Sequence, residues 1–265
     1  IFYTGLVIGA IALSRQWGFL LFLPLIFLFF SKELNIKYLK LWSLSAFFGA
    51  AFSSWFYINL FLRYGTFTPF NLDRRGFSFS NQKLNFYIPN SEHFQYLFTK
   101  PIRPHLDNQF ISILYSDLWG DYWGYFTFTS RFLDIGRNQL AIGDYFARIN
   151  IISAFTSIVI VALCIKTFRK YKSRFIVQYL KLAIICSFIG YLIFAIAYPD
   201  ATSDTVKATY IIQLFHLMVF TASIYLNYLE KINKKIYISI ISFLVIAYIH
   251  NFQSYLSHFP INFYP

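Results

Sequence analysis

Charged residues are scarce in this 265-residue chain, where Asp, Glu, Lys and Arg together make up only 13% of the sequence. Water-soluble domains carry about a quarter charged residues. The low share, together with a hydrophobic content of 57%, therefore excludes both a soluble domain and a disordered chain. Cysteine is also rare. Its two copies, Cys164 and Cys186, fall inside apolar runs, which excludes a disulfide framework and a cysteine-based metal site.

An initiator methionine is absent as well, because the chain begins at Ile1 with no basic region ahead of a cleavable apolar stretch. These first residues do not match a signal peptide. We interpret the chain as the C-terminal fragment of a longer protein.

Long apolar runs are what the sequence does contain. A membrane-spanning helix needs about 20 predominantly apolar residues, and the segments that approach or exceed this length are 41–62, 149–167, 176–198, 209–229 and 236–256. The opening stretch 1–30 is interrupted by Ser14-Arg15-Gln16. We read it as two separate pieces. Residues 2–13 are either a tilted or re-entrant helix or the end of a span that begins upstream, and residues 17–30 are short for a full span. We predict an all-α polytopic membrane protein with about six to seven transmembrane or re-entrant helices.

The positions of the basic residues predict the orientation of these helices. Three short loops contain only two acidic residues, Glu33 and Glu230, yet carry most of the net charge of +12. Their basic residues are Lys32, Lys37, Lys40, Lys166, Arg169, Lys170, Lys172, Arg174, Lys181, Lys231, Lys234 and Lys235. This pattern is typical of cytoplasmic loops, so the positive charge does not indicate nucleic-acid binding.

The orientation divides the chain into three parts. Residues 1–62 are membrane helices that form a truncated N-terminal part of the bundle, 63–148 form one extracytoplasmic loop region, and 149–265 are the C-terminal membrane helices. Long external segments usually carry function. We predict a multi-pass protein of the plasma membrane or of an endoplasmic-reticulum-like membrane.

The densest polar and aromatic cluster of the external segment contains Arg103, His105, Asp117, Trp119 and Asp121. In a helix, Asp117 and Asp121 would share a face at i,i+4, a spacing that suits the hydroxyls of a sugar or a divalent ion, and Trp119 would offer a ring for the sugar to stack on. The alternative is that these aromatic side chains pack at the membrane interface. The histidines are too scattered for a zinc motif. We assign no metal site, and a divalent cofactor stays open.

Two cations lie beside apolar segments. Arg15 is costly to bury unpaired, so it faces a water-filled cavity, a carboxylate or an anionic ligand, or else extends to the outer interface. Lys207 is expected in the first turn of the span near 209, where Asp204 or Thr205 would cap the helix and positive charge opposes the helix dipole. A phosphate held by Lys207 and Tyr210, which share a face at i,i+3, would relieve this conflict. The alternative is an interfacial anchor pair.

A family resemblance rests on the opening segment, which reads Gly5-Leu6-Val7-Ile8-Gly9-Ala10-Ile11-Ala12-Leu13-Ser14-Arg15-Gln16-Trp17-Gly18 and then Leu20-Leu21-Phe22-Leu23-Pro24-Leu25. This segment resembles the Gly-Leu…Gly-Leu…Leu-Thr-Lys…Leu-Leu…Pro segment of the dolichyl-phosphate-mannose protein mannosyltransferase-like glycosyltransferases, polytopic enzymes of the C superfamily. The long external segment and Lys207-Ala208-Thr209-Tyr210 ahead of a late span are similar to the later half of that architecture. Ser14-Arg15 stands where the family commonly has Thr-Lys.

The resemblance implies transfer of a sugar from a polyprenyl-phosphate donor, a membrane lipid, to an acceptor protein, lipid or glycan on the extracytoplasmic side. The family's catalytic acid lies in a first external loop, which we expect upstream of Ile1. The donor phosphate would then contact Arg15, Lys207 and Tyr210. The sugar or the acceptor would contact Arg103, His105, Asp117, Trp119 and Asp121.

Two other classes of function stay open at this point. One is a transporter or flippase of a lipid-linked or small polar substrate, and the other is a non-catalytic membrane assembly subunit. Transporters often contain paired broken helices in corresponding halves. This sequence has one interruption and no detectable repeat, which disfavours transport.

Overall fold

The structure, a computed structural model, describes residues 1–14, 16–31, 36–67, 76–99, 101, 109–120, 136–199 and 206–256. These parts of the chain are helical and contain no strand, which confirms the all-α prediction. The elements are α1 (Phe2–Ser14), η1 (Gln16–Leu21), α2 (Phe22–Ser31), α3 (Ile36–Tyr64), η2 (Phe79–Asn81), α4 (Leu84–Tyr87), α5 (Ser91–Thr99), α6 (Phe110–Trp119), α8 (Gly136–Lys170), α9 (Phe175–Ala197), η3 (Ala208–Tyr210), α10 (Ile212–Ile232), α11 (Lys234–Asn251) and η4 (Phe252–Leu256).

Five helices in the described part of the chain are long and apolar enough to cross a membrane. They cover Leu39–Tyr64, Asp144–Lys170, Phe175–Ala197, Ile212–Ile232 and Lys234–Ser254, and they match the five predicted spans within a few residues at most ends. Large apolar side chains such as Phe47, Ile158 and Ile246 are exposed on these helices, as expected when lipid is the solvent. The chain is therefore a multi-pass membrane protein by helix length and composition.

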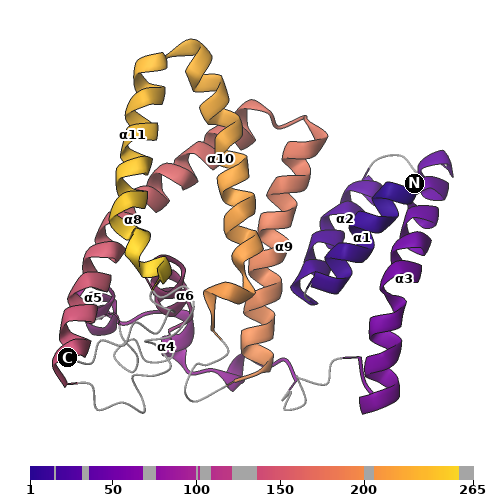
Figure 1. The fold of residues 1–265 in the computed structure, drawn as a ribbon, viewed down its shortest axis with the longest axis horizontal. Coiled ribbons are helices and arrows are strands. Elements are labelled where there is room, and N and C mark those ends of the chain that lie inside the picture. Colours follow the sequence, from indigo (N-terminus) through magenta and orange to yellow (C-terminus); the bar gives the residue numbers. More distant parts are fainter. Residues whose placement is uncertain are drawn as a thin grey trace.

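The basic connections lie together. The turns between α8 and α9 and between α10 and α11 lie at one end of the bundle, as do the end of α2 and the beginning of α3, whereas α4, α5 and α6 lie at the opposite end (Figure 1). This grouping is the one that the positive-inside pattern requires.

The N-terminal helices form a hairpin whose first arm, α1, packs on α3 and whose second arm, η1 and α2, packs on α9 (Figure 1). The Ser45 hydroxyl donates to the Ile1 carbonyl and the Tyr57 hydroxyl to the Ala12 carbonyl, so α1 and α3 run in the same direction. The chain then folds back through η1 and α2. The α-helix resumes at Phe22 with Pro24 in its first turn, where a missing N–H costs nothing. The two pieces expected between residues 1 and 30 are thus present as α1 and η1–α2.

Close contact between α1 and α3 depends on glycine. A Cβ at Gly5 would lie 2.5 Å from Phe48 Cβ and 2.9 Å from the Ser45 carbonyl oxygen, and one at Gly49 would lie 2.6 Å from Ile8 Cγ2. Gly9 is similarly close to the Gly49 carbonyl oxygen, at 2.9 Å. Small residues four apart let two helix backbones approach in a membrane, where there is little hydrophobic drive for association.

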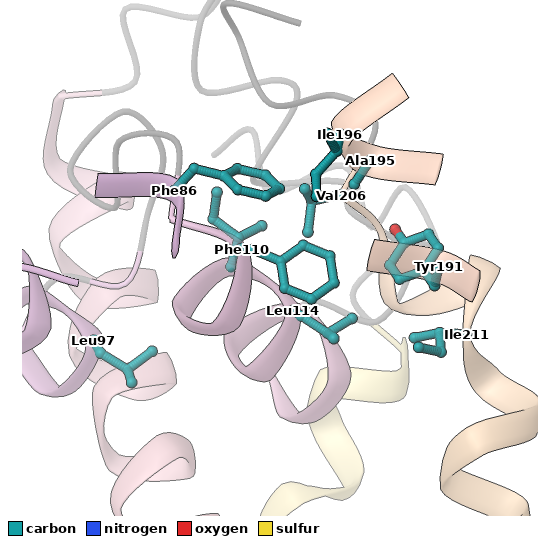
Figure 2. Close-up of a cluster of buried hydrophobic side chains, with 10 residues drawn as sticks. Phe86, Leu97, Phe110, Leu114, Tyr191, Ala195, Ile196, Val206 and Ile211 are labelled. Atoms are coloured by element: carbon teal, nitrogen blue, oxygen red, sulfur yellow. The ribbon is translucent and has the colours of Figure 1, made fainter. Parts of the chain in front are cut away.

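Helices α4, α5 and α6 pack onto the ends of the membrane helices through a buried apolar cluster. Figure 2 shows Phe86 of α4 and Phe110 of α6 beside Tyr191 of α9 and Val206, which precedes η3. The predicted loop region 63–148 therefore contains α4, α5, α6 and the beginning of α8. This cluster fixes the chain around residue 207 against α9.

Candidate functional site

The helix that follows the 199–207 segment begins later than the sequence suggests. Its first residue is Ile212, with Ile211 at the N-cap, so the prediction that Lys207 lies in the first turn of this span is wrong. Lys207 instead precedes the short 3₁₀ turn η3, in an extended conformation with φ −137° and ψ 134°. Asp204 and Thr205, the expected capping residues, lie outside the described residues.

Burial of its neighbours explains the position of Lys207. Val206, Ala208 and Ile211 are buried, and Val206 and Ile211 belong to the cluster between α9 and α6. In an extended chain successive side chains point to opposite sides. With Val206 and Ala208 directed into the protein, the side chain of Lys207 is directed away from it and is partly exposed.

Lys207 and Tyr210 do lie next to one another. The Lys207 Nζ atom lies 5.6 Å from the centroid of the Tyr210 ring, within the range of a cation–π interaction. The Tyr210 ring also makes edge-to-face contacts with Tyr191 and Phe194 of α9, at centroid distances of 6.4 and 6.5 Å. The pair is thus seated on an aromatic surface at the end of the bundle away from the basic connections.

Tyr191, which sequence reasoning missed, fixes this arrangement. Its side chain is fully buried. Its hydroxyl accepts a hydrogen bond from the Lys207 N–H at 2.6 Å and donates one to the Lys207 carbonyl oxygen at 3.1 Å. The sequence signal that could have identified it is a tyrosine inside the apolar run 176–198, because a hydroxyl in a membrane helix needs a polar partner.

Asp117 and Trp119, the described members of the external cluster, are both buried in α6. The Trp119 indole Nε1 donates to the Ser157 hydroxyl oxygen at 3.1 Å, and the ring packs edge-to-face on Phe215 at 5.1 Å. An indole held between α8 and α10 in this way is not an open stacking surface. Its predicted contact with a sugar or acceptor stays a prediction that requires α6 to move.

Only one member of the expected i,i+4 pair of carboxylates, Asp117, lies in the described part of α6. The helix ends at Trp119, and the N–H of Gly120 bonds back to the Ser116 carbonyl oxygen at 2.8 Å. Asp121 lies outside the described residues, as do Arg15, Arg103 and His105. Among the residues described, no group of three or more His, Cys, Asp or Glu side chains could hold a metal ion.

A buried amide joins α6 to α5 and α8. The Asn150 Nδ2 atom of α8 donates to the Leu97 carbonyl oxygen at 2.8 Å and to the Ser116 hydroxyl at 3.3 Å. The Tyr115 hydroxyl donates to the Asn150 carbonyl oxygen at 2.6 Å. Burial raises the pKa of the Tyr115 hydroxyl, with a hydrogen bond to Ser157 acting in the opposite sense, so this group stays a protonated donor. The network fixes α6 on the membrane helices.

The arrangement offers one chemical capability among the described residues: a cation and a phenol next to one another where membrane helices end. Such a pair suits an anion that is presented at a membrane surface. Comparison of the chain with protein-family models, with curated proteins and with solved structures finds no match.

Proposed function

We propose that this chain is the C-terminal part of a membrane glycosyltransferase that moves a sugar from a polyprenyl-phosphate donor to an acceptor on the extracytoplasmic side. One observation carries the proposal. The buried Tyr191 hydroxyl bonds both backbone groups of Lys207 and so holds this cation and Tyr210 at the end of α10.

This position suits a lipid phosphate. The polyprenyl chain of the donor lies in the hydrocarbon, and its phosphate lies where the apolar helices end. Lys207 and Tyr210 lie immediately ahead of the apolar helix Ile212–Ile232, at the end of the bundle opposite the basic connections (Figure 1). A cation there binds the phosphate in the ground state and stabilises the added negative charge as it leaves.

The reaction is a displacement at the anomeric carbon. An acceptor oxygen forms a bond to that carbon, the bond from carbon to the phosphate oxygen breaks, and the phosphate leaves with the electron pair. The acceptor proton passes to a carboxylate, which we place upstream of Ile1. In this scheme Lys207 and Arg15 bind the phosphate and Tyr210 donates a hydrogen bond. Arg103, His105 and Asp121 are proposed for the sugar or the acceptor, and Asp117 and Trp119, which are buried in α6, would join them only if α6 moved.

The test is a transfer assay on the full-length protein in native membranes, supplied with a panel of polyprenyl-phosphate hexoses and pentoses that carry tritium in the sugar. We expect Lys207→Ala to lower transfer by about 100-fold, the size of losing one charge-stabilising group. Lys172→Ala is the control, because Lys172 is an exposed cation in the turn between α8 and α9. Full transfer by Lys207→Ala, alone or with Arg15→Ala, would contradict the assignment.

Transport is the second candidate: the α1–α2 interruption has no paired counterpart in the sequence, but its two helices are short. At about 1.5 Å per helical residue, neither α1 nor α2 is long enough alone for a hydrocarbon core of about 30 Å, and transporters bind substrates at such short, interrupted helices. In the same membranes, a transporter would move the labelled donor between leaflets without releasing its sugar. Neither release nor movement of the donor would indicate an assembly subunit.

A further inference from the structure

An exposed apolar surface lies on the external segment between α3 and α5. It consists of Phe77, Phe79, Leu84 and Ile88, which we call the 77–88 patch. The Phe79 side chain is 66% exposed, Leu84 71% and Ile88 63%. The Phe77 and Phe79 rings lie 5.1 Å apart, so the patch contains a contiguous aromatic surface. Exposed apolar patches mark contact with a partner or with a membrane.

The depth of this patch relative to the membrane is set by hydrogen bonds to the end of α9. The Gln82 Nε2 atom donates to the Ala195 carbonyl oxygen at 2.8 Å, and the Asn81 Nδ2 atom donates to the Ile196 carbonyl oxygen at 3.1 Å. The last carbonyls of a helix have no partner within the helix. The two amides fill this need at the end of a membrane span, so the patch lies level with that end.

The same segment alternates between buried and exposed side chains. Gln82 and Phe86 are buried against α9 and α6, while Leu84 and Ile88 face outward. Inward contacts therefore fix the backbone. The Tyr87 hydroxyl, which donates to the Phe79 carbonyl oxygen at 2.8 Å, fixes the fold of the segment itself.

Helix α9 is exposed along part of its span and covered at its end. On that helix Ile185, Ile189 and Ile193 form an exposed stripe, which is the surface that lipid covers. In the next turn Ala195 and Ile196 are buried, because residues 81–86 cover them. The 77–88 patch is thus on the outer side of a segment that packs on the end of this lipid-exposed helix.

We propose that the 77–88 patch inserts into the lipid leaflet at this end of the bundle and anchors the external segment to the membrane surface. Its composition suits the interface between acyl chains and headgroups. Aromatic rings favour that depth, and the one charge between Gly76 and Ile88 is Lys83, a side chain that extends to phosphate headgroups. The proposal does not depend on the enzymatic activity of the chain.

The test uses the protein in nanodiscs of phosphatidylcholine and phosphatidylglycerol, in which both membrane surfaces are open to solvent. The background carries Cys164→Ala and Cys186→Ala. Single cysteines from Phe79→Cys or Leu84→Cys are labelled with an environment-sensitive nitrobenzoxadiazole. Glu92→Cys on the exposed face of α5 is the water-facing control, and Ile246→Cys on α11 is the lipid-facing control.

We expect lipids with a nitroxide near the headgroup to quench the labels at positions 79 and 84 at least twofold more than the label at 92. Aqueous iodide should quench them at least threefold less than it quenches position 92. Iodide quenching equal to that at position 92 would overturn the proposal, because the patch would then face water. Protection from both quenchers would overturn it as well, because a second copy or another protein would then cover the patch. The second labelled position guards against a folding defect at the first.

Discussion

The hydroxyl of Tyr191 is the smallest group whose removal tests the candidate site. Tyr191→Phe keeps the ring, so packing against Phe110 and Phe194 is retained, with centroid distances of 5.7 and 6.2 Å. It removes the acceptor of the Lys207 N–H and the donor to the Lys207 carbonyl oxygen. A buried polar group that loses its partner costs about 1–3 kcal/mol. We expect the free energy of unfolding to fall by about that amount.

The assay is thermal unfolding of the detergent-solubilised protein. For a chain near this size, each kcal/mol lowers the midpoint by about 2–4 °C. Tyr225→Phe is the control, because its hydroxyl has no hydrogen bond among the residues that the structure describes, whereas its ring packs against a buried cluster that includes Leu163, Cys164 and Leu229. In the transfer assay, Tyr191→Phe should raise the donor KM more than it lowers kcat, since it acts by positioning Lys207. Equal midpoints and equal KM values for the two variants would refute the reasoning.

Two further predictions concern packing and buried polarity. Gly5→Leu introduces a side chain whose first carbon alone would lie 2.5 Å from Phe48 Cβ, so we expect a loss of about 1–3 kcal/mol. The loss should appear as a lower unfolding midpoint and as faster maleimide labelling of a cysteine placed at the buried position 53 of α3 by Ser53→Cys. The control is Ala10→Leu on the exposed face of α1, which should change neither the midpoint nor the labelling rate. Asn150→Leu removes the donor to the Leu97 carbonyl oxygen and should cost about 1–3 kcal/mol, which would show as faster amide hydrogen exchange in α5 and α6. Unchanged exchange would mean that other contacts hold these helices in place.

The spans were predictable because a membrane imposes a length and a composition on each helix. The predicted ends fail where a helix continues past the lipid. Residues 136–148 were assigned to the external region, since charged residues such as Arg137, Asp144 and Arg148 interrupt the apolar run, yet α8 begins at Gly136. A hydropathy pattern locates the residues that contact hydrocarbon. The backbone hydrogen bonds of a helix can continue past those residues, so the pattern does not locate the end of the helix.

The candidate site was predictable only in part. The proximity of Lys207 and Tyr210 followed from their spacing, although the turn that joins them is a 3₁₀ turn rather than the first turn of the span. Their support by Tyr191 depends on a contact between residues 16 apart. Asp117 and Trp119 were expected to face a ligand, but the apolar residues around them, in the segment Phe110–Trp119, turn α6 into a buried helix. Polar spacing alone does not show which side of a helix packs inward.

The bonds from Asn81 and Gln82 to the end of α9 also bear on biosynthesis. The Asn81 contact joins residues 115 apart in sequence, and ribosomes add roughly 5–20 residues per second. Residues 76–88 therefore emerge roughly 6–23 s before their partner carbonyls exist. During that interval the two amides lack their α9 acceptors, and Phe86 has Phe110 of α6 to pack on but not α9. Residues 76–88 thus complete their packing only after α9, the third of the five long helices in the described part of the chain, has been made, and chaperones and proteases compete for them during this interval.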